Sequence, residues 1–237
     1  MINISDIHKR FGKNEVLKGI NLEFNQKGVF AILGPNGSGK TTLIKTILGM
    51  VIPNSGEILV QGESTKMNWE YRRSIDYLPQ IANFPVNLRV QELFNMIRDL
   101  RNRKDVDMEP FIQRLGLEPY LDKRLGNLSG GTKQKVNLVL TFAFDSPIII
   151  LDEPTTGLDP VALLVLKDMI NEEKVKGKLI LLTSHIMNFV EEISDEVVFL
   201  LEGKVYFKGT VEELKTETEE ADFEHAIANL LTLQNYA

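Results

Sequence analysis

The sequence predicts an α/β fold organised around a mixed, largely parallel sheet in which helices form the crossover connections. Short apolar runs at residues 28–33, 148–151 and 179–182 are typical of strands buried on both faces. Residues 161–176 lie between the last two runs, have helical apolar spacing and end before Gly177. A strand, a helix and a second strand in that order indicate parallel strands joined by a helical crossover.

Further elements are predicted around these strands. Residues 40–49 carry apolar side chains at helical spacing directly after the first strand. Residues 84–143 are rich in helix formers and show no alternating pattern, so we expect a mainly helical insertion. Residues 196–208 predict two strands around a turn. Thr210 begins a capping box, and apolar residues at i, i+3, i+4, i+7 and i+8 over 223–231 predict a final helix.

The composition excludes several classes of protein. The 237 residues include 27 Lys and Arg, 33 Asp and Glu and no cysteine, which gives a net charge of −6. Without cysteine there is no disulfide, thiolate zinc site or cysteine nucleophile, and a cytoplasmic location fits. The negative charge argues against a nucleic-acid coat. No uncharged stretch reaches the roughly 18 residues of a transmembrane helix, so we expect membrane association only through a partner.

A glycine-rich loop after the first strand predicts a site for a nucleoside triphosphate. Residues 34–41, GPNGSGKT, match G-x-x-x-x-G-K-[ST] between a strand and a helix, which is the context that this pattern needs. The glycines let backbone N–H groups point at phosphate oxygens, and the helix N-terminus adds further donors. Lys40 can reach the terminal phosphates, and the Thr41 hydroxyl can bind Mg²⁺. The alternative, a tight turn without a ligand, is disfavoured by this context.

Two adjacent acids follow the second buried strand, where a magnesium–triphosphate site needs a carboxylate. We expect Asp152 to hold Mg²⁺ through its water shell and Glu153 to polarise an attacking water. Taken alone, the pair is also compatible with a solvated turn. His185 follows the third strand at the same edge of the sheet, so a catalytic role competes with a purely structural one.

The order of these motifs resembles that of the ATP-binding-cassette (ABC) ATPases, the nucleotide-binding subunits of ABC transporters. Their distinctive signature, Leu-Ser-Gly-Gly-Gln, stands here as LSGGT at residues 128–132, between the phosphate loop and Asp152. The resemblance covers about residues 1–210. It implies a P-loop NTPase core with an N-terminal antiparallel β subdomain and an α-helical subdomain inserted at about 84–143. Residues 211–237 would form a C-terminal helical tail.

The resemblance also implies a nucleotide-binding set and a metal set. The nucleotide-binding residues would be Phe11, Gly34, Pro35, Asn36, Gly37, Ser38, Gly39, Lys40, Thr41 and Thr42. Phe11 would stack on adenine, although a core aromatic is the alternative. Gln80 would sense Mg²⁺ at the hinge between the core and the helical insertion, so Thr41, Gln80 and Asp152 would surround the metal.

Other implied roles concern catalysis and a second copy of the chain. Glu153, His185 and Gln80 would be catalytic, with His185 contacting the γ-phosphate. Ser129, Gly130 and Gly131 would contact the γ-phosphate of ATP held by the second copy, and Asp159 would cross the dimer interface. Two chains would thus pack head to tail around two ATP molecules, and hydrolysis would let them separate.

These roles imply an ATPase that uses ATP and Mg²⁺ to drive a transmembrane permease on separate chains, at the inner face of the cell membrane. Residues 77–80, YLPQ, and the short tail resemble export-type cassettes, with a narrower likeness to the copper-maturation transporter ATPase of nitrous oxide reductase. A soluble ABC ATPase of cluster assembly or similar work is the first alternative. A docking subunit that binds ATP without hydrolysis is the second, and the presence of Lys40, Asp152, Glu153 and His185 weighs against it.

The signature departs from the family pattern at two positions. Thr132 stands where Gln is usual, and Lys135 replaces a common Arg. Ser129 and Gly131 are retained, so we expect activity to persist with coupling that is weaker or altered. We expect Thr132→Gln to change turnover by less than about tenfold, or some 1.4 kcal/mol.

Overall fold

The computed structural model describes residues 1–66 and 68–232 and contains two sheets. The strands are β1 Ile2–Phe11, β2 Asn14–Phe24, β3 Gly28–Leu33, β4 Ser55–Val60, β5 Glu63–Ser64, β6 Ile75–Leu78, β7 Ile148–Asp152, β8 Leu179–Thr183, β9 Glu196–Leu201 and β10 Lys204–Gly209. The smaller sheet has the order β2-β1-β4-β5, and its strands pair antiparallel. The larger sheet has the order β10-β9-β3-β8-β7-β6.

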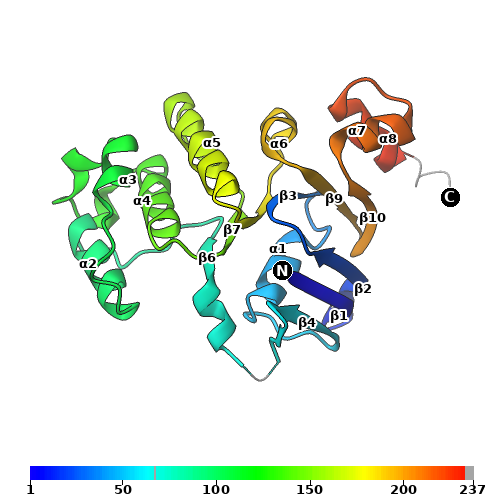
Figure 1. Cartoon of the computed structure of the whole chain (residues 1–237), viewed down its shortest axis with the longest axis horizontal. Helices are drawn as coiled ribbons and strands as arrows, with labels where there is room; N and C mark the ends of the chain where they lie inside the picture. The colour runs from blue at the N-terminus through cyan, green and yellow to red at the C-terminus, as the bar shows by residue number, and fades with distance from the viewer. Residues whose placement is uncertain (67, 233–237) are drawn as a thin grey trace.

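The helices gather in groups around the larger sheet. The α-helices are α1 Lys40–Ile47, α2 Val90–Leu100, α3 Glu109–Arg114, α4 Gly130–Phe142, α5 Pro160–Val175, α6 Met187–Ile193, α7 Val211–Thr218 and α8 Phe223–Thr232. Short 3₁₀ turns lie at Glu70–Ser74, Glu118–Tyr120 and Leu125–Asn127. Figure 1 shows α2, α3 and α4 together at one end of the molecule and α7 and α8 at the other. None of the described helices combines the length and apolar character needed to cross a membrane.

The larger sheet confirms the predicted parallel core. Strands β3, β8, β7 and β6 pair in parallel, β9 pairs in parallel with β3, and the terminal strand β10 is antiparallel to β9. Side chains alternate along β3: Val29 and Leu33 pack beneath helices on one face, whereas Phe30 and Ile32 pack against α1 and the smaller sheet on the other. Apolar residues on both faces are the reason why this segment lacks an alternating pattern.

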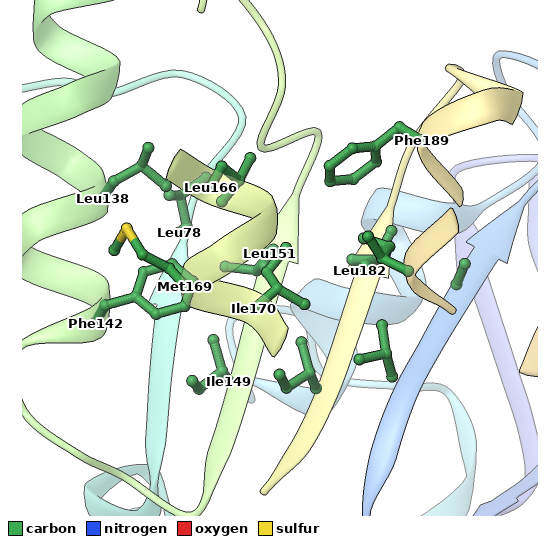
Figure 2. Close-up of a cluster of buried hydrophobic side chains, with 14 of the residues drawn as sticks. Leu78, Leu138, Phe142, Ile149, Leu151, Leu166, Met169, Ile170, Leu182 and Phe189 are labelled. Carbon is green, nitrogen blue, oxygen red and sulfur yellow. The ribbon is translucent and has the colours of Figure 1, made fainter. Parts of the chain in front are cut away.

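The apolar core joins the helical group to the sheet. Figure 2 shows Leu138 and Phe142 of α4 beside Leu78 of β6 and Met169 of α5, all members of one buried cluster. Phe142 is 3% exposed and Leu138 is fully buried. This shared core fixes the direction of α4 relative to β6 and β7, at whose carboxyl ends the predicted site lies.

The predicted strands and helices are confirmed. The helix expected over 161–176 spans Pro160–Val175, and the two strands expected over 196–208 are β9 and β10. The capping box at Thr210 is present: its hydroxyl accepts a hydrogen bond from the Glu213 N–H, and the Glu213 carboxylate accepts one from the Thr210 N–H. The final helix is α8, which packs against α6 and α7.

Candidate active site

The glycine-rich loop connects β3 to α1 and has a backbone that requires glycine. Gly34 has a φ of 145°, and a Cβ there would lie 1.9 Å from the carbonyl oxygen of Leu200 in β9. Gly39 caps α1 with a φ of 109°. Lys40 begins the helix, and its Nζ donates hydrogen bonds to the carbonyl oxygens of Gly34 at 2.6 Å and Pro35 at 3.1 Å. The loop therefore curls around the Lys40 side chain, and these hydrogen bonds hold the ammonium group against the loop backbone.

A cleft of about 290 Å³ unites eight of the predicted residues from three segments. Lys40 and Thr41 come from α1, Gln80 comes from the segment after β6, and Glu153 follows β7. The other four predicted residues in the lining are Asn36, Gly37, Gly39 and Thr42, and the lining also contains Asn14 and Val16. Because β3, β7 and β6 belong to the parallel part of the larger sheet, their carboxyl ends meet at the same edge. The cleft has the location that open α/β sheets use for ligands.

The polar groups of the loop fit an anionic ligand. Burial lowers the pKa of Lys40, and the negative charges of Glu153 and Asp152 partly oppose this effect. A phosphate beside this ammonium group would offset the cost of burying it. The Ser38 hydroxyl is buried and has no hydrogen-bond partner within the described part of the chain. Both groups gain a partner if a phosphate occupies the loop.

The two adjacent acids lie at the predicted strand end and share one supporting residue. Asp152 is the last residue of β7 and is 1% exposed. Its Oδ1 accepts a hydrogen bond from the Thr183 hydroxyl at 2.7 Å. The same hydroxyl oxygen accepts a hydrogen bond from the Glu153 N–H at 2.9 Å. Asp152 and Thr183 are directly paired in the parallel register of β7 and β8, so one side chain fixes both acids.

Glu153 has an unusual backbone conformation and a specific partner. Its φ is 50°, in the left-handed region that non-glycine residues rarely adopt. Its Oε2 lies 2.7 Å from Nδ1 of His185. Glu153 is 8% exposed, whereas the His185 side chain is 71% exposed. The backbone turn thus aims a nearly buried carboxylate at the cleft, and a solvent-facing imidazole contacts it.

Thr183 and Asn137 are supporting residues that sequence reasoning missed. Thr183 ends a strand that is otherwise apolar, and a hydroxyl residue at the end of an apolar run was the available signal in the sequence. The structure shows that this hydroxyl is fully buried. Asn137 of α4 donates a hydrogen bond from Nδ2 to the Pro79 carbonyl at 3.3 Å. This bond ties the helical group to the residue before Gln80, and nothing in the local sequence around Asn137 indicates it.

The signature segment starts α4 and lies outside the cleft. Ser129 is the N-cap of α4, and both Ser129 and Gly130 are exposed. A Cβ at Gly131 would lie 2.4 Å from the Gly157 carbonyl oxygen, so close packing requires glycine there. A Cβ at Gly130 would meet no atom within 4 Å beyond its own helix. Packing within the described chain therefore explains why position 131 is a glycine, but it does not explain the glycine at position 130.

Asp159 and Phe11 have surroundings that the sequence did not predict. Asp159 is the N-cap of α5, accepts a hydrogen bond from the Ala162 N–H at 2.8 Å and forms an ion pair with Lys135 at 2.7 Å. The hydrogen bond from Lys135 is the main cause that lowers the pKa of Asp159. Phe11 ends β1, is 50% exposed and lies 4.9 Å from the Lys9 amine. It is therefore not a core aromatic, and it does not line the cleft.

Comparison with known proteins identifies the family that has this arrangement. A family model described as "ABC transporter" matches residues 17–156. The Nod factor export ATP-binding protein I of Rhizobium sp. (strain N33) is 33% identical over 214 residues, which are 88% of this chain and 70% of that protein.

Two solved structures share the fold. One, described as the structure of the ATP binding subunit of an ABC transporter, superposes with a TM-score of 0.91 at 30% identity and covers 98% of this chain and 99% of its own. The second is a dimeric post-hydrolysis state of the ATP-binding cassette MJ0796 bound to ADP and Pi, with a TM-score of 0.76 at 24% identity. It covers 89% of this chain and 98% of its own.

Proposed function

The chain belongs to the ABC transporter family as an ATP-binding ATPase subunit, and from that premise we propose that two copies clamp two ATP molecules head to tail. Hydrolysis of ATP to ADP and phosphate opens the clamp and powers a separate membrane permease. The observation that carries this proposal is the separation of the two phosphate-binding elements. Lys40 lines the cleft, whereas exposed Ser129 and Gly130 lie outside it.

The phosphates of ATP bind to the loop at residues 34–42. Its backbone N–H groups and the N-terminus of α1 donate to phosphate oxygens, the Ser38 hydroxyl gains its missing partner, and Lys40 exchanges loop carbonyls for the terminal phosphates. Phe11, at the exposed end of β1, is the proposed platform for adenine. Burial lowers the pKa of Lys40, and this supports a site in which the ammonium group is stabilised by a bound anion.

The proposed magnesium ligands are oxygen atoms, the donor type that this hard cation prefers. The Thr41 hydroxyl and the Gln80 amide both line the cleft, and the Asp152 carboxylate lies at the end of β7 directly before Glu153. When bound, Mg²⁺ offsets the negative charge of the phosphates. The Thr183 hydroxyl donates a hydrogen bond to Oδ1 of Asp152. This bond restricts rotation of the Asp152 carboxylate and so orients it.

Hydrolysis is assigned to Glu153, with His185 and Gln80 in support. A water attacks the γ-phosphorus, the bond to the β,γ-bridging oxygen breaks, and the Glu153 carboxylate accepts the proton of the water. His185 contacts Glu153 at 2.7 Å and is exposed enough to exchange this contact for a γ-phosphate oxygen. Gln80, which also lines the cleft, orients the water.

The second half of each site comes from the partner copy. Ser129, Gly130 and Gly131 present a hydroxyl and helix N–H groups, and Gly130 has room for a close approach from outside its own chain. The MJ0796 structure, a dimer with ADP and Pi, supports an arrangement of this kind in a chain of the same fold. Asp159 follows the segment that packs on Gly131, and this proximity to the signature supports the proposal that Asp159 crosses the interface.

Transport is assigned from the relatives. The Rhizobium relative is an export protein by name, which supports an export-type permease as the partner and the cytoplasmic face of the membrane as the location. Purification of the native complex in detergent tests this assignment. Recovery of a membrane protein with several spans supports it, whereas recovery of a cluster-assembly protein instead would make the chain a non-transport ATPase.

Substitutions at Glu153 and Lys40 test the chemistry. Glu153→Gln keeps the shape of the side chain and removes its basicity, so ATP binding persists and hydrolysis falls at least a hundredfold. Lys40→Ala weakens ATP binding because the ammonium group is lost from the loop. Glu224→Gln, at an exposed residue of α8, is the matched charge control and keeps wild-type turnover. Undiminished turnover of Glu153→Gln would contradict its role as base.

A further inference from the structure

The first turn of α4 contains a contact between two hydroxyl groups. The Ser129 Oγ accepts a hydrogen bond from the Thr132 N–H at 3.2 Å, which is the N-cap interaction of this helix. The same Oγ lies 2.8 Å from the Thr132 Oγ1, so one of the two hydroxyls donates to the other. Thr132 therefore contacts the Ser129 hydroxyl through its backbone and through its side chain.

The direction of this second hydrogen bond decides what Ser129 can offer to a ligand. A hydroxyl has one proton and two lone pairs. If Ser129 donates to Thr132, its proton is used within the helix and a lone pair faces outward. If Thr132 donates, Ser129 accepts twice and its own proton faces outward. An approaching phosphate favours the second arrangement, because a phosphate oxygen repels a lone pair and attracts a proton.

We infer that Thr132 is a positioning residue, whose hydroxyl keeps the proton of Ser129 directed toward the γ-phosphate of the ATP held by the partner copy. The inference rests on the proposed function, in which Ser129 acts across the dimer interface. It assigns a role to the position at which the signature departs from the usual sequence, where a Thr replaces a Gln.

Tertiary contacts hold the backbone of the first turns of α4, so the orientation of the Ser129 hydroxyl proton is the feature that depends on Thr132. Gly131 packs against the Gly157 carbonyl oxygen, and Lys135, on the next turn of α4, pairs with Asp159 at 2.7 Å. Gln134 donates from Nε2 to the Pro154 carbonyl at 3.0 Å. These contacts fix the helix to the segment after Glu153. The Ser129 hydroxyl is exposed and could rotate, and the hydrogen bond from Thr132 restricts this rotation. A donor that is already oriented binds an anion better than a mobile one.

The test compares two substitutions at position 132 in the Glu153→Gln background. Thr132→Val keeps the N–H, the branched shape and therefore the N-cap, but it removes the hydroxyl. Thr132→Ser keeps the hydroxyl and removes a methyl group. Thr216→Val, at an exposed threonine of α7 whose hydroxyl donates to the Glu212 carbonyl, is the matched control. Sedimentation over a range of protein concentrations with MgATP gives the dimer dissociation constant of each variant.

We expect Thr132→Val to raise the dimer dissociation constant about tenfold, because both sites of the dimer lose the oriented donor. Thr132→Ser and Thr216→Val should keep the parent value. ATP affinity of the dilute monomer should not change in any variant, since Thr132 acts on the nucleotide of the other chain. A purely structural role would instead lower thermal stability and leave dimerisation of the folded protein unchanged.

Three results overturn the inference and can be told apart. If Thr132→Val dimerises as well as the parent, the hydroxyl has no positioning role. If Thr132→Ser is as weak as Thr132→Val, the methyl group and not the hydroxyl is responsible. If the Glu153→Gln parent remains monomeric with saturating MgATP, the head-to-tail dimer itself is wrong, and the inference is wrong with it.

Discussion

Replacing Thr183 by valine removes the hydroxyl that holds both acids of the candidate site. The hydroxyl donates to Asp152 at 2.7 Å and accepts from the Glu153 N–H at 2.9 Å, in a position with no exposed surface. Valine has the same shape, so it leaves no cavity that water could enter. The Glu153 N–H then has no acceptor, and the Asp152 carboxylate has lost a donor.

The expected cost follows from these two losses. An unsatisfied buried N–H costs about 1–3 kcal/mol, and a hydrogen bond to a charged group contributes about 1.5–3 kcal/mol. Because both effects come from one hydroxyl they overlap, and we expect a loss of about 3 kcal/mol in the free energy of unfolding. For a chain of this size that is a decrease of about 6–12 °C in melting temperature. Turnover should fall at least about tenfold, because the left-handed turn at Glu153 loses its anchor.

Urea unfolding and ATP turnover measure these effects. Thr183→Ser keeps the hydroxyl and is the control, with a loss of about 1 kcal/mol for the missing methyl group. A Thr183→Val protein within about 0.5 kcal/mol of wild type, a normal value for a surface change, would refute the reasoning. So would normal turnover in a variant with the expected loss of stability, because the hydroxyl would then support the fold and not the site.

Three further substitutions test the fold and the charges near the site. Phe142→Ala in α4 should destabilise the protein by about 3–5 kcal/mol in urea unfolding, because it opens a cavity in the core of Figure 2. Asp76→Asn should cost about 1–3 kcal/mol by the same measurement, because buried Asp76 accepts hydrogen bonds from the Arg101 side chain and the Ser146 N–H. Burial, and then the charge of Asp152, raise the pKa of Tyr77 from 10.0 to about 12, so its contribution to stability is complete below pH 10 and is lost as the pH rises to 12. Thermal melts should therefore show wild type losing stability relative to Tyr77→Phe over that interval, and parallel curves would contradict the shift.

Local patterns were sufficient to predict the central sheet and the nucleotide loop. The loop at residues 34–41 is recognisable because its glycines and Lys40 must have fixed spacing along the chain. Strands β7 and β8 are continuous apolar runs because both of their faces are covered. Asp152 and Glu153 directly follow the apolar run of β7. Their position at the carboxyl edge of the sheet could therefore be predicted from the order of residues along the chain.

The smaller sheet and the signature depended on the family resemblance. Strand β1 contains register shifts, and Asp6 within it has a φ of 49°. Such bulges interrupt the alternation that identifies a strand in a sequence. Gly130 and Gly131 start a helix, where glycine by itself indicates little. Only the structure separates Gly131, which packs on the Gly157 carbonyl, from Gly130, which faces open space.

Contacts between distant segments were not predictable from the sequence. The ion pair between Lys135 and Asp159 joins α4 to α5, and the bond from Asn137 to Pro79 joins α4 to the segment before Gln80. The Thr183 hydroxyl reaches both acids only because β7 and β8 pair in one particular register. Each of these contacts depends on tertiary packing, about which the residues flanking each partner carry no signal.

The central claim is that two copies of the chain hold ATP between them, and the mass of Glu153→Gln in solution tests it most directly. Light scattering during size-exclusion chromatography should give one chain without nucleotide and with MgADP, and twice that mass with MgATP. Nucleotide extracted from the larger species should amount to one ATP per chain. A mass of one chain at saturating MgATP, with ATP bound, would contradict the claim.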